Sequence, residues 1–305
     1  MKHSVKISDS NNLLDHIHIY NEKLSARIYP NLGGSIQQLI VNNVKIIDGI
    51  SNDQKGIDDY ATTYKSSVLF PFPNRIEDGS YEFMETKYQL PVNEPSVNNA
   101  IHGVVYNKAF EISAVESEKD VSNIVLSYSS KGATPGFPFP FELKLTYSIY
   151  ATGSLKLKFD ILNKGDQPFP YGLGWHPYFL ADSLKDCTLS FPSRDFYLCN
   201  KRSLPVNMTA SSLSESFKMA DSSFDDAYSL NRSECRFESN SYSLNLAFDY
   251  PEGTYLQVYT PPHRQSIAIE PMTCVANSFN NQIGLKELLP GTSDSWTIHM
   301  DLNVK

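Results

Sequence analysis

Apolar residues recur at every second position over much of this chain, and that period of two is the feature that most constrains its fold. Phe, Leu, Leu, Tyr and Ile occupy the odd positions of 141–149, and Leu, Leu, Phe and Ile occupy those of 155–161. Such alternation is typical of half-buried β-strands. The short segment Ala151, Thr152 and Gly153 between the two runs predicts a hairpin with a tight turn.

The same alternation predicts further strands within 24–28, 124–128, 244–248, 256–258, 267–269 and 296–302. Helical periodicity is weak, and only 211–219 and 284–289 are expected to form a turn or two of helix. The 18 prolines, with pairs in 70–73 and 137–140, are expected at sheet edges and in loops because proline cannot donate to a central ladder. The expected fold is all-β, a large antiparallel β-sandwich.

Composition limits the class of partner. A formal net charge of −8 argues against nucleic acid, whose binders carry a basic face, and favours a neutral small-molecule ligand. The four cysteines form no CxxC pair, so no metal site is expected from them. We find no signal peptide and no apolar run near the ~20 residues that span a bilayer. We therefore expect a cytoplasmic protein with no membrane association; no feature predicts an oligomeric state.

A candidate site emerges from strand parity. In 265–270, Ile267 and Ile269 point to one side of the strand, so Glu270 points to the other. The preceding strand places Gln257 and Tyr259 opposite to its apolar residues, on what is expected to be the same face as Glu270. The alternative is that Glu270 is an exposed charge at a strand end.

Two histidines, an arginine and an aspartate add to this candidate site. His176 lies in Gly-Trp-His-Pro-Tyr-Phe, where Trp175, Tyr178 and Phe179 offer the flat apolar surfaces on which sugars stack; the alternative is a core histidine in an aromatic cluster. His102 precedes a glycine in a loop. Asn74 and Arg75 follow Phe-Pro-Phe-Pro, and the planar guanidinium suits bidentate contact with adjacent hydroxyls, although it could be an ordinary surface charge.

These pieces together resemble the aldose 1-epimerase (galactose mutarotase) family, whose members interconvert the α and β anomers of free sugars. The resemblance extends over roughly residues 24–302. Because the candidate site residues run from 74 to 270, a domain boundary between them would cut through the site, so a single domain, 1–305, is expected. The motifs occur in the family's order: Asn74-Arg75-Ile76, His102-Gly103, His176-Pro177-Tyr178-Phe179, Phe224-Asp225, Gln257-x-Tyr259-Thr260 and Glu270-Pro271-Met272-Thr273. After His102-Gly103 this chain carries Tyr106-Asn107, where many relatives have Arg-Trp or a similar pair.

The resemblance implies a galactose-mutarotase-like supersandwich and a role for each residue. Glu270 would be the base at the O1 hydroxyl and His176 the acid at the ring oxygen. Arg75, His102 and Asp225 would hold sugar hydroxyls, with Asp225 preferred over Asp226, and Asn74 and Gln257 would line the pocket. Opening the ring needs one base and one acid on opposite sides of the anomeric centre, and glutamate and histidine have suitable pKa values. No metal and no cofactor are required.

Three readings compete with a mutarotase of free hexoses. A hexose-6-phosphate mutarotase would need a cluster of Arg or Lys for the dianion; Lys108, His263 and Arg264 are candidates beyond Arg75. A non-catalytic carbohydrate-binding protein would have no use for an acid and base around the anomeric centre. His16, His18 and Glu22 have the spacing of a cupin metal site, but the expected inward positions of Ile17 and Ile19 would leave both histidines on a solvated face.

Overall fold

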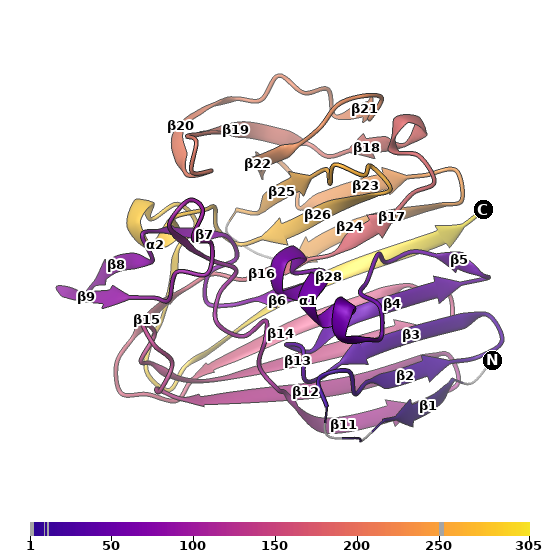
Figure 1. The fold of residues 1–305 in the computed structure, drawn as a ribbon, viewed down its shortest axis with the longest axis horizontal. Helices are drawn as coiled ribbons and strands as arrows, with labels where there is room; N and C mark the ends of the chain where they lie inside the picture. The colour runs from indigo at the N-terminus through magenta and orange to yellow at the C-terminus, as the bar shows by residue number, and fades with distance from the viewer. Residues whose placement is uncertain (1–2, 9, 11, 250–252) are drawn as a thin grey trace.

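The structure is a computed structural model that describes residues 3–8, 10, 12–249 and 253–305. Two large antiparallel sheets dominate it (Figure 1). The first has nine strands, in the order β11 (Glu111–Ser117), β12 (Val121–Lys131), β13 (Pro140–Tyr150), β14 (Leu155–Asn163), β28 (Ser293–Val304), β24 (Tyr242–Asp249), β23 (Glu234–Glu238), β18 (Thr188–Ser190) and β21 (Ser216–Lys218).

The second large sheet carries the residues of the candidate site. Its order is β20 (Pro205–Ala210), β19 (Ser193–Cys199), β22 (Asp225–Leu230), β25 (Tyr255–Tyr259), β26 (Ser266–Met272), β16 (Gly174–His176) and β6 (Ser67–Leu69), and β17 (Tyr178–Leu180) also pairs with β26.

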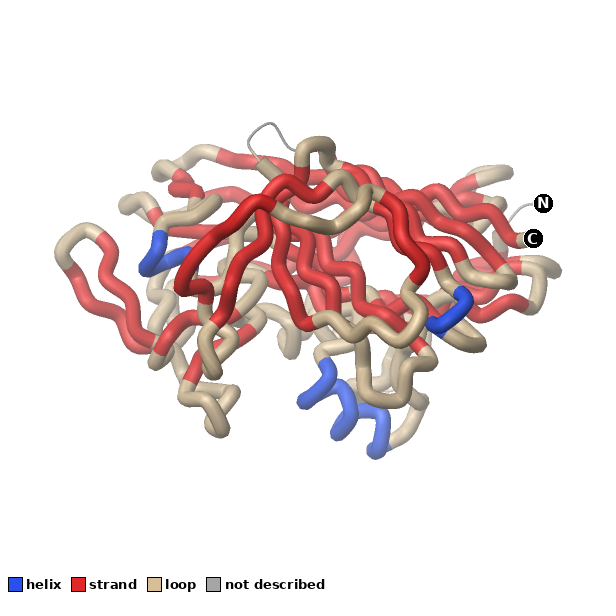
Figure 2. Tube along the Cα trace, turned by 90° about the horizontal axis from the view of Figure 1, so that it is seen from above, coloured by secondary structure: helices blue, strands red, loops and turns tan. Residues whose placement is uncertain are grey.

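A five-stranded sheet and three two-stranded ribbons complete the strands. The sheet is β1 (Ser4–Ile7), β2 (Ile17–Tyr20), β3 (Leu24–Tyr29), β4 (Ser35–Val41) and β5 (Val44–Lys45). The ribbons pair β7 (Arg75–Glu77) with β10 (Asn99–Ile101), β8 (Ser80–Phe83) with β9 (Thr86–Gln89), and β15 (Phe169–Tyr171) with β27 (Lys286–Leu288). The strands form curved layers, and the longest helix lies outside them (Figure 2).

Alternation produces the core as expected. In β13 and β14 the odd-numbered residues are buried and most even-numbered ones are partly exposed, and the two strands pair as the predicted hairpin with Ile149 opposite Leu155. Every segment predicted as a strand from alternation lies in a strand. One buried hydrophobic cluster runs from Ile17 to Leu302 and includes both tryptophans, which belong to different large sheets. The predicted all-β sandwich is therefore confirmed.

The helix predictions were wrong, because both segments predicted as helical contain strands and the helices of the structure lie elsewhere. Residues 211–219 and 284–289 contain the short strands β21 and β27, which gain backbone partners in β18 and β15. The helices are α1 (Gln54–Thr63), α2 (Ser278–Asn281) and a 3₁₀ turn at Leu184–Asp186. In α1 only Gly56 and Tyr60 are buried, so the helix has no apolar stripe to detect; its start is fixed by Asp53, whose side chain accepts a hydrogen bond from the Gly56 amide.

The proline pairs lie where they were expected, but Pro271 does not. The pair at 70–73 lies in the loop after β6, and the pair at 137–140 ends at the first residue of β13. Pro271 lies inside β26, a central strand. The Ile269 amide donates to the Pro177 carbonyl oxygen, so the missing N–H of Pro271, two residues further on, would face the same edge, where β26 changes partner from β17 at Ala268 to β16 at Met272.

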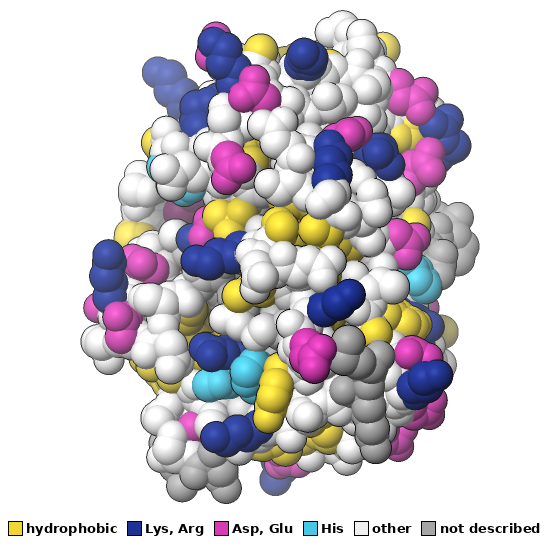
Figure 3. Space-filling model, turned by 90° about the vertical axis from the view of Figure 1, so that its right-hand side faces the viewer, with side chains coloured by type: hydrophobic (Ala, Val, Ile, Leu, Met, Phe, Trp, Pro, Cys, Tyr) yellow, Lys and Arg dark blue, Asp and Glu magenta, His cyan; other side chains and the backbone are white. Residues whose placement is uncertain are grey.

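Charged side chains of both signs intermingle on the face seen in Figure 3. Among the described residues no helix is long and apolar enough to cross a membrane.

Candidate active site

A cavity of about 620 Å³ opens where the eight-stranded sheet meets the β7–β10 ribbon and the end of α1. All seven residues predicted for the site line it: Asn74, Arg75, His102, His176, Asp225, Gln257 and Glu270. They come from six separate parts of the chain, and the fold brings every one of them to the same cavity. Tyr64, Lys65, Glu94, Tyr178, Tyr259 and His263 are among the other lining residues.

Three neighbouring strands supply the floor of the cavity. Gln257 of β25 lies directly opposite Glu270 of β26, so the two share one face of the sheet, as strand parity predicted. Gln257 donates a hydrogen bond from Nε2 to Asp225 Oδ1 at 3.0 Å, and its Oε1 lies 3.5 Å from Asn74 Nδ2. Gln257 thus links Asp225 in the floor of the cavity to Asn74 in its wall. Asp226, the next residue of β22, is absent from the lining, because adjacent strand residues point to opposite faces.

Glu270 and His176 form the most buried ionisable contact of the site. Their side chains are 2% and 7% exposed, and Glu270 Oε1 lies 3.5 Å from His176 Nε2. The remaining polar atoms, Glu270 Oε2 and His176 Nδ1, are buried and have no hydrogen-bond partner among the described residues. A buried polar atom without a partner is rare in folded proteins, and here both belong to residues that line a cavity.

Burial moves the two pKa values in opposite directions. Desolvation, and secondarily the Asp225 charge, raises the pKa of Glu270 well above 4.5, while Arg75 opposes that change. Desolvation also holds the pKa of His176 well below 6.5, with the neighbouring His102 lowering it further. These directions favour a neutral carboxyl group beside a neutral imidazole.

His102 lines the cavity, and its hydrogen bonding defines which of its ring nitrogens can accept a hydrogen bond. Its Nδ1–H donates to the Pro73 carbonyl oxygen at 2.9 Å, which leaves Nε2 as an acceptor. Its ring packs edge-on against that of His176, with centroids 4.9 Å apart. Burial lowers the pKa of His102 to about 3, so the ring stays neutral and the tautomer is fixed. The backbone of His102 is left-handed, with φ 64°.

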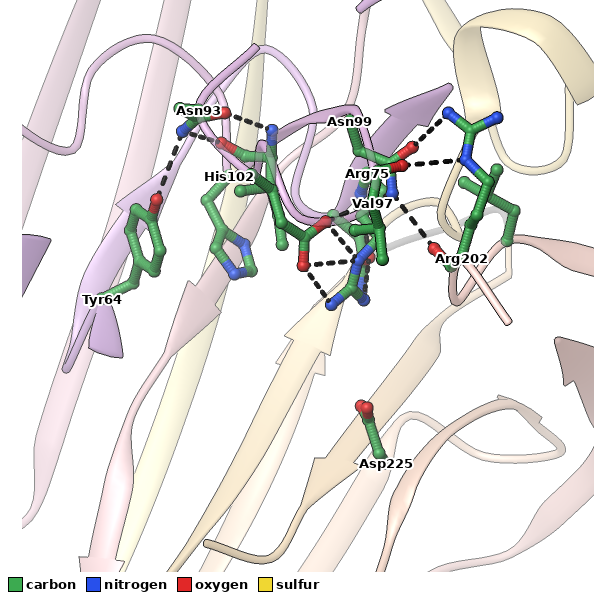
Figure 4. Close-up of polar contacts among 12 residues, drawn as sticks. Tyr64, Arg75, Asn93, Val97, Asn99, His102, Arg202 and Asp225 are labelled. Atoms are coloured by element: carbon green, nitrogen blue, oxygen red, sulfur yellow. Dashed lines mark hydrogen bonds and ion pairs between the residues drawn. The ribbon is translucent and has the colours of Figure 1, made fainter. Parts of the chain in front are cut away.

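The basic groups of the cavity are paired with acids. Arg75 Nη2 lies 2.9 Å from Glu94 Oε1, and Lys65 Nζ lies 2.8 Å from Asp48 Oδ1. In Figure 4 the Arg75 guanidinium and His102 lie on one side of the cavity and Asp225 on the other. Glu94 was not predicted from the sequence. It belongs to no motif, and its position between two prolines, Pro91 and Pro95, was the only local signal.

Several sequence-based expectations need correction. Of the three aromatics near His176, only Tyr178 lines the cavity, stacking on the His176 ring at a centroid distance of 5.1 Å. Trp175 and Phe179 are fully buried in the core because they point to the opposite face. Of the three possible phosphate ligands, His263 reaches the cavity, Arg264 bonds the 220–223 segment, and Lys108 lines a different cavity.

The cupin-like spacing does not form a cluster. His18 Nε2 contacts Ser25 Oγ at 2.8 Å, and the His16 ring stacks on Tyr29. Ile17 and Ile19 are fully buried, as predicted. Within the described part of the chain, no three His, Cys, Asp or Glu residues are grouped closely enough to hold a metal ion.

Comparisons with known proteins identify a family for this chain. A family described as aldose 1-epimerase matches residues 15–301. The uncharacterized protein YihR of Escherichia coli K12 is 30% identical over 237 residues, which cover 73% of this chain and 74% of that protein.

Solved structures share the fold. A galactose mutarotase-like protein from Clostridium acetobutylicum superposes with a TM-score of 0.87 at 22% identity, covering 100% of this chain and 99% of that one. The galactose 1-epimerase of Lactobacillus acidophilus superposes with a TM-score of 0.79 at 16% identity, covering 99% of each chain. On the match over nearly its whole length, the chain belongs to the aldose 1-epimerase family.

Proposed function

We propose that this protein interconverts the α and β anomers of a free hexose, with Glu270 as the base at O1 and His176 as the acid at the ring oxygen. The observation that carries the proposal is the buried contact between Glu270 and His176, a carboxyl group and an imidazole 3.5 Å apart in the lining of a polar cavity.

The proton balance of the reaction suits this pair. In ring opening, the O1 proton moves to Glu270 and the proton on His176 moves to the ring oxygen. The open-chain aldehyde rotates about C1–C2, and the two transfers reverse on the other face. The pair thus holds one proton throughout: on His176 before opening and on Glu270 afterwards. Burial favours the second distribution, so the Glu270 carboxylate with protonated His176 that must precede opening is the minor form, and Arg75 stabilises its carboxylate.

The charge of the cavity supports an uncharged substrate. Its basic side chains Arg75 and Lys65 are each committed to a carboxylate, and Asp225 and Glu270 add further acids. A sugar phosphate would need unpaired Arg or Lys to replace the water it loses. Asp225, Gln257, Asn74 and His102 instead offer the neutral and acidic hydrogen-bonding groups that suit hydroxyls.

Saturation-transfer NMR of galactose and glucose anomers tests the proposal. We expect catalysed exchange in the wild type and none above the uncatalysed rate in Glu270→Gln or His176→Asn, because each removes one proton-transfer partner. Circular dichroism should show both variants folded. Normal exchange in Glu270→Gln would refute the assigned mechanism. Sugar binding by the wild type without exchange would identify a carbohydrate-binding protein instead.

A further inference from the structure

The Arg75 guanidinium is fixed on one side by Glu94. Nε donates to Glu94 Oε2 at 2.9 Å and Nη2 donates to Oε1 at 2.9 Å, a bidentate arrangement. Both side chains are mostly buried, with 16% of Arg75 and 22% of Glu94 exposed. Nη1 contacts only the Asn74 Oδ1 atom, at the long distance of 3.5 Å, within the described residues. The Nη1 edge is therefore the part of Arg75 that remains available for a ligand.

Glu94 is itself held by Asn99. The two residues exchange backbone hydrogen bonds of 3.0 and 3.2 Å, and Asn99 Nδ2 donates to Glu94 Oε2 at 3.2 Å. Asn99 is fully buried in β10. Because its amide also needs an acceptor and a donor elsewhere, its orientation depends on a further partner.

Arg202 is that partner, and it comes from the loop between β19 and β20. Its Nη2 donates to Asn99 Oδ1 at 3.1 Å, and its carbonyl oxygen accepts from Asn99 Nδ2 at 3.1 Å. Its Nε donates to the Val97 carbonyl oxygen at 2.9 Å. Figure 4 shows Asn99 between Arg202 and Arg75. The side-chain oxygen and nitrogen of Asn99 thus both find partners in one orientation of the amide only.

We propose that Glu94, held in place by Asn99 and Arg202, is a positioning residue through which the cavity selects substrates by their charge. It aims the Nη1 edge of Arg75 at a sugar hydroxyl and offsets the Arg75 charge, so that the cavity selects uncharged sugars over phosphorylated ones. The proposal rests on the proposed function and extends it to a residue that never takes part in proton transfer.

Steady-state kinetics on free hexoses and their 6-phosphates test this assignment. Glu94→Gln should raise KM for the free sugar about 10-fold, with kcat changed less than about 3-fold, since a charged hydrogen bond that orients Arg75 is weakened. The ratio of kcat/KM for the 6-phosphate to that for the free sugar should rise in the same variant and fall again as salt is added. Glu94→Asp, which keeps the charge but shortens the reach, should raise KM without changing that ratio.

A double variant separates positioning from direct contact, because Glu94 also lines the cavity. Glu94→Gln should change KM less than about 2-fold when added to Arg75→Gln, since a residue that acts through Arg75 has nothing left to position. The matched control is Glu142→Gln, which removes a carboxylate 3.4 Å from Lys164 on the nine-stranded sheet and should leave all constants unchanged.

An undiminished effect of Glu94→Gln in the Arg75→Gln background would overturn the assignment, because Glu94 would then contact the sugar itself. So would an unchanged KM and an unchanged phosphate ratio in Glu94→Gln alone. If the wild type fails to exchange anomers, the proposed function fails separately. Dissociation constants from NMR titration with the same sugars and variants would then replace KM and decide the positioning role.

Discussion

At the scale of single residues, the chemistry of the site depends on which of Glu270 and His176 holds the one proton that they share. Glu270 and His176 lie within 3.5 Å of each other in a setting that disfavours charge on either. The ion pair and the neutral pair contain the same number of protons, so the pair as a whole titrates rather than each group. Arg75 favours the carboxylate form of Glu270 but disfavours a protonated His176, so its charge acts in opposite senses on the two members of the ion pair.

A pH profile follows from these directions. The pair takes up a second proton only when His176 is protonated beside an already protonated Glu270, and burial places that event well below pH 6.5. Catalysed exchange, corrected for the solvent rate, should therefore not fall as pH drops through 6.5. Nitrogen-15 NMR should find neutral His176 and neutral, Nδ1-protonated His102 at pH 6. An acid limb with an apparent pKa of 6.5, or an imidazolium signal from His176 at pH 6, would contradict this.

At the scale of elements, the floor of the site is a regular sheet and its walls are turns and loops. β22, β25 and β26 place Asp225, Gln257 and Glu270 by ladder register alone. His102 instead depends on the turn after β10, where both His102 and Gly103 have left-handed backbone. A Cβ on Gly103 would lie 2.2 Å from the Phe70 carbonyl oxygen. The position of His102 therefore requires close contact between this turn and the loop after β6.

Replacing Gly103 and Gly291 by alanine separates this contact from backbone strain. Both glycines are left-handed, with φ 76° and 69°, but no atom lies within 4 Å of a Cβ at Gly291. Gly291→Ala should cost about 1 kcal/mol of unfolding free energy and leave exchange unchanged. Gly103→Ala should cost roughly 1–3 kcal/mol more, from the added overlap, and weaken sugar binding through His102. Urea unfolding and KM measure both; equal losses in the two variants would remove the role given to the contact.

At the scale of the whole molecule, charge limits the substrate. The net charge is −8, and acidic and basic side chains intermingle on the face shown in Figure 3. In the cavity, Arg75 and Lys65 each form an ion pair with a carboxylate. No charged encounter is therefore expected to speed substrate arrival.

Free galactose or glucose should accordingly be turned over with higher kcat/KM than the matching 6-phosphate, and 0.1–0.5 M salt, roughly the range where surface charges are screened, should change the free-sugar rate little. Saturation-transfer NMR and polarimetry across both sugar series provide the measurement. Higher efficiency with the 6-phosphate, weakening steeply with salt, would assign the protein to hexose 6-phosphates. In that case His263 and Lys65 are the first residues to replace.

We also propose that the two large sheets unfold as one unit. Trp175 lies in β16 of the eight-stranded sheet and Trp296 in β28 of the nine-stranded sheet, and both belong to the same buried cluster. In Trp175→Phe the remaining Trp296 reports on the nine-stranded sheet, and in Trp296→Phe the remaining Trp175 reports on the eight-stranded sheet. Fluorescence transitions in urea should coincide between the two variants, after allowing for their stabilities, and coincide with circular dichroism. Separate midpoints for the two probes within one variant would show two domains.

The sequence by itself determined the strands and one face of the site. Alternation has a period set by backbone geometry, so it located β12, β13, β14, β24 and β28 among others, and parity alone placed Gln257 on the same face as Glu270. Proline positions in the loops followed from the missing N–H for the same local reason.

Tertiary structure decided everything that depends on partners distant in the chain. The segments of β21 and β27 became strands because β18 and β15 offered them backbone partners, and Trp175 joined the core while its neighbour His176 reached the cavity. Glu94 gained its place from Asn99, and Asn99 gained its orientation from Arg202, 103 residues away. Such contacts have no period and no local propensity; they exist only once the sheets have packed and the cost of ordering the loops has been met.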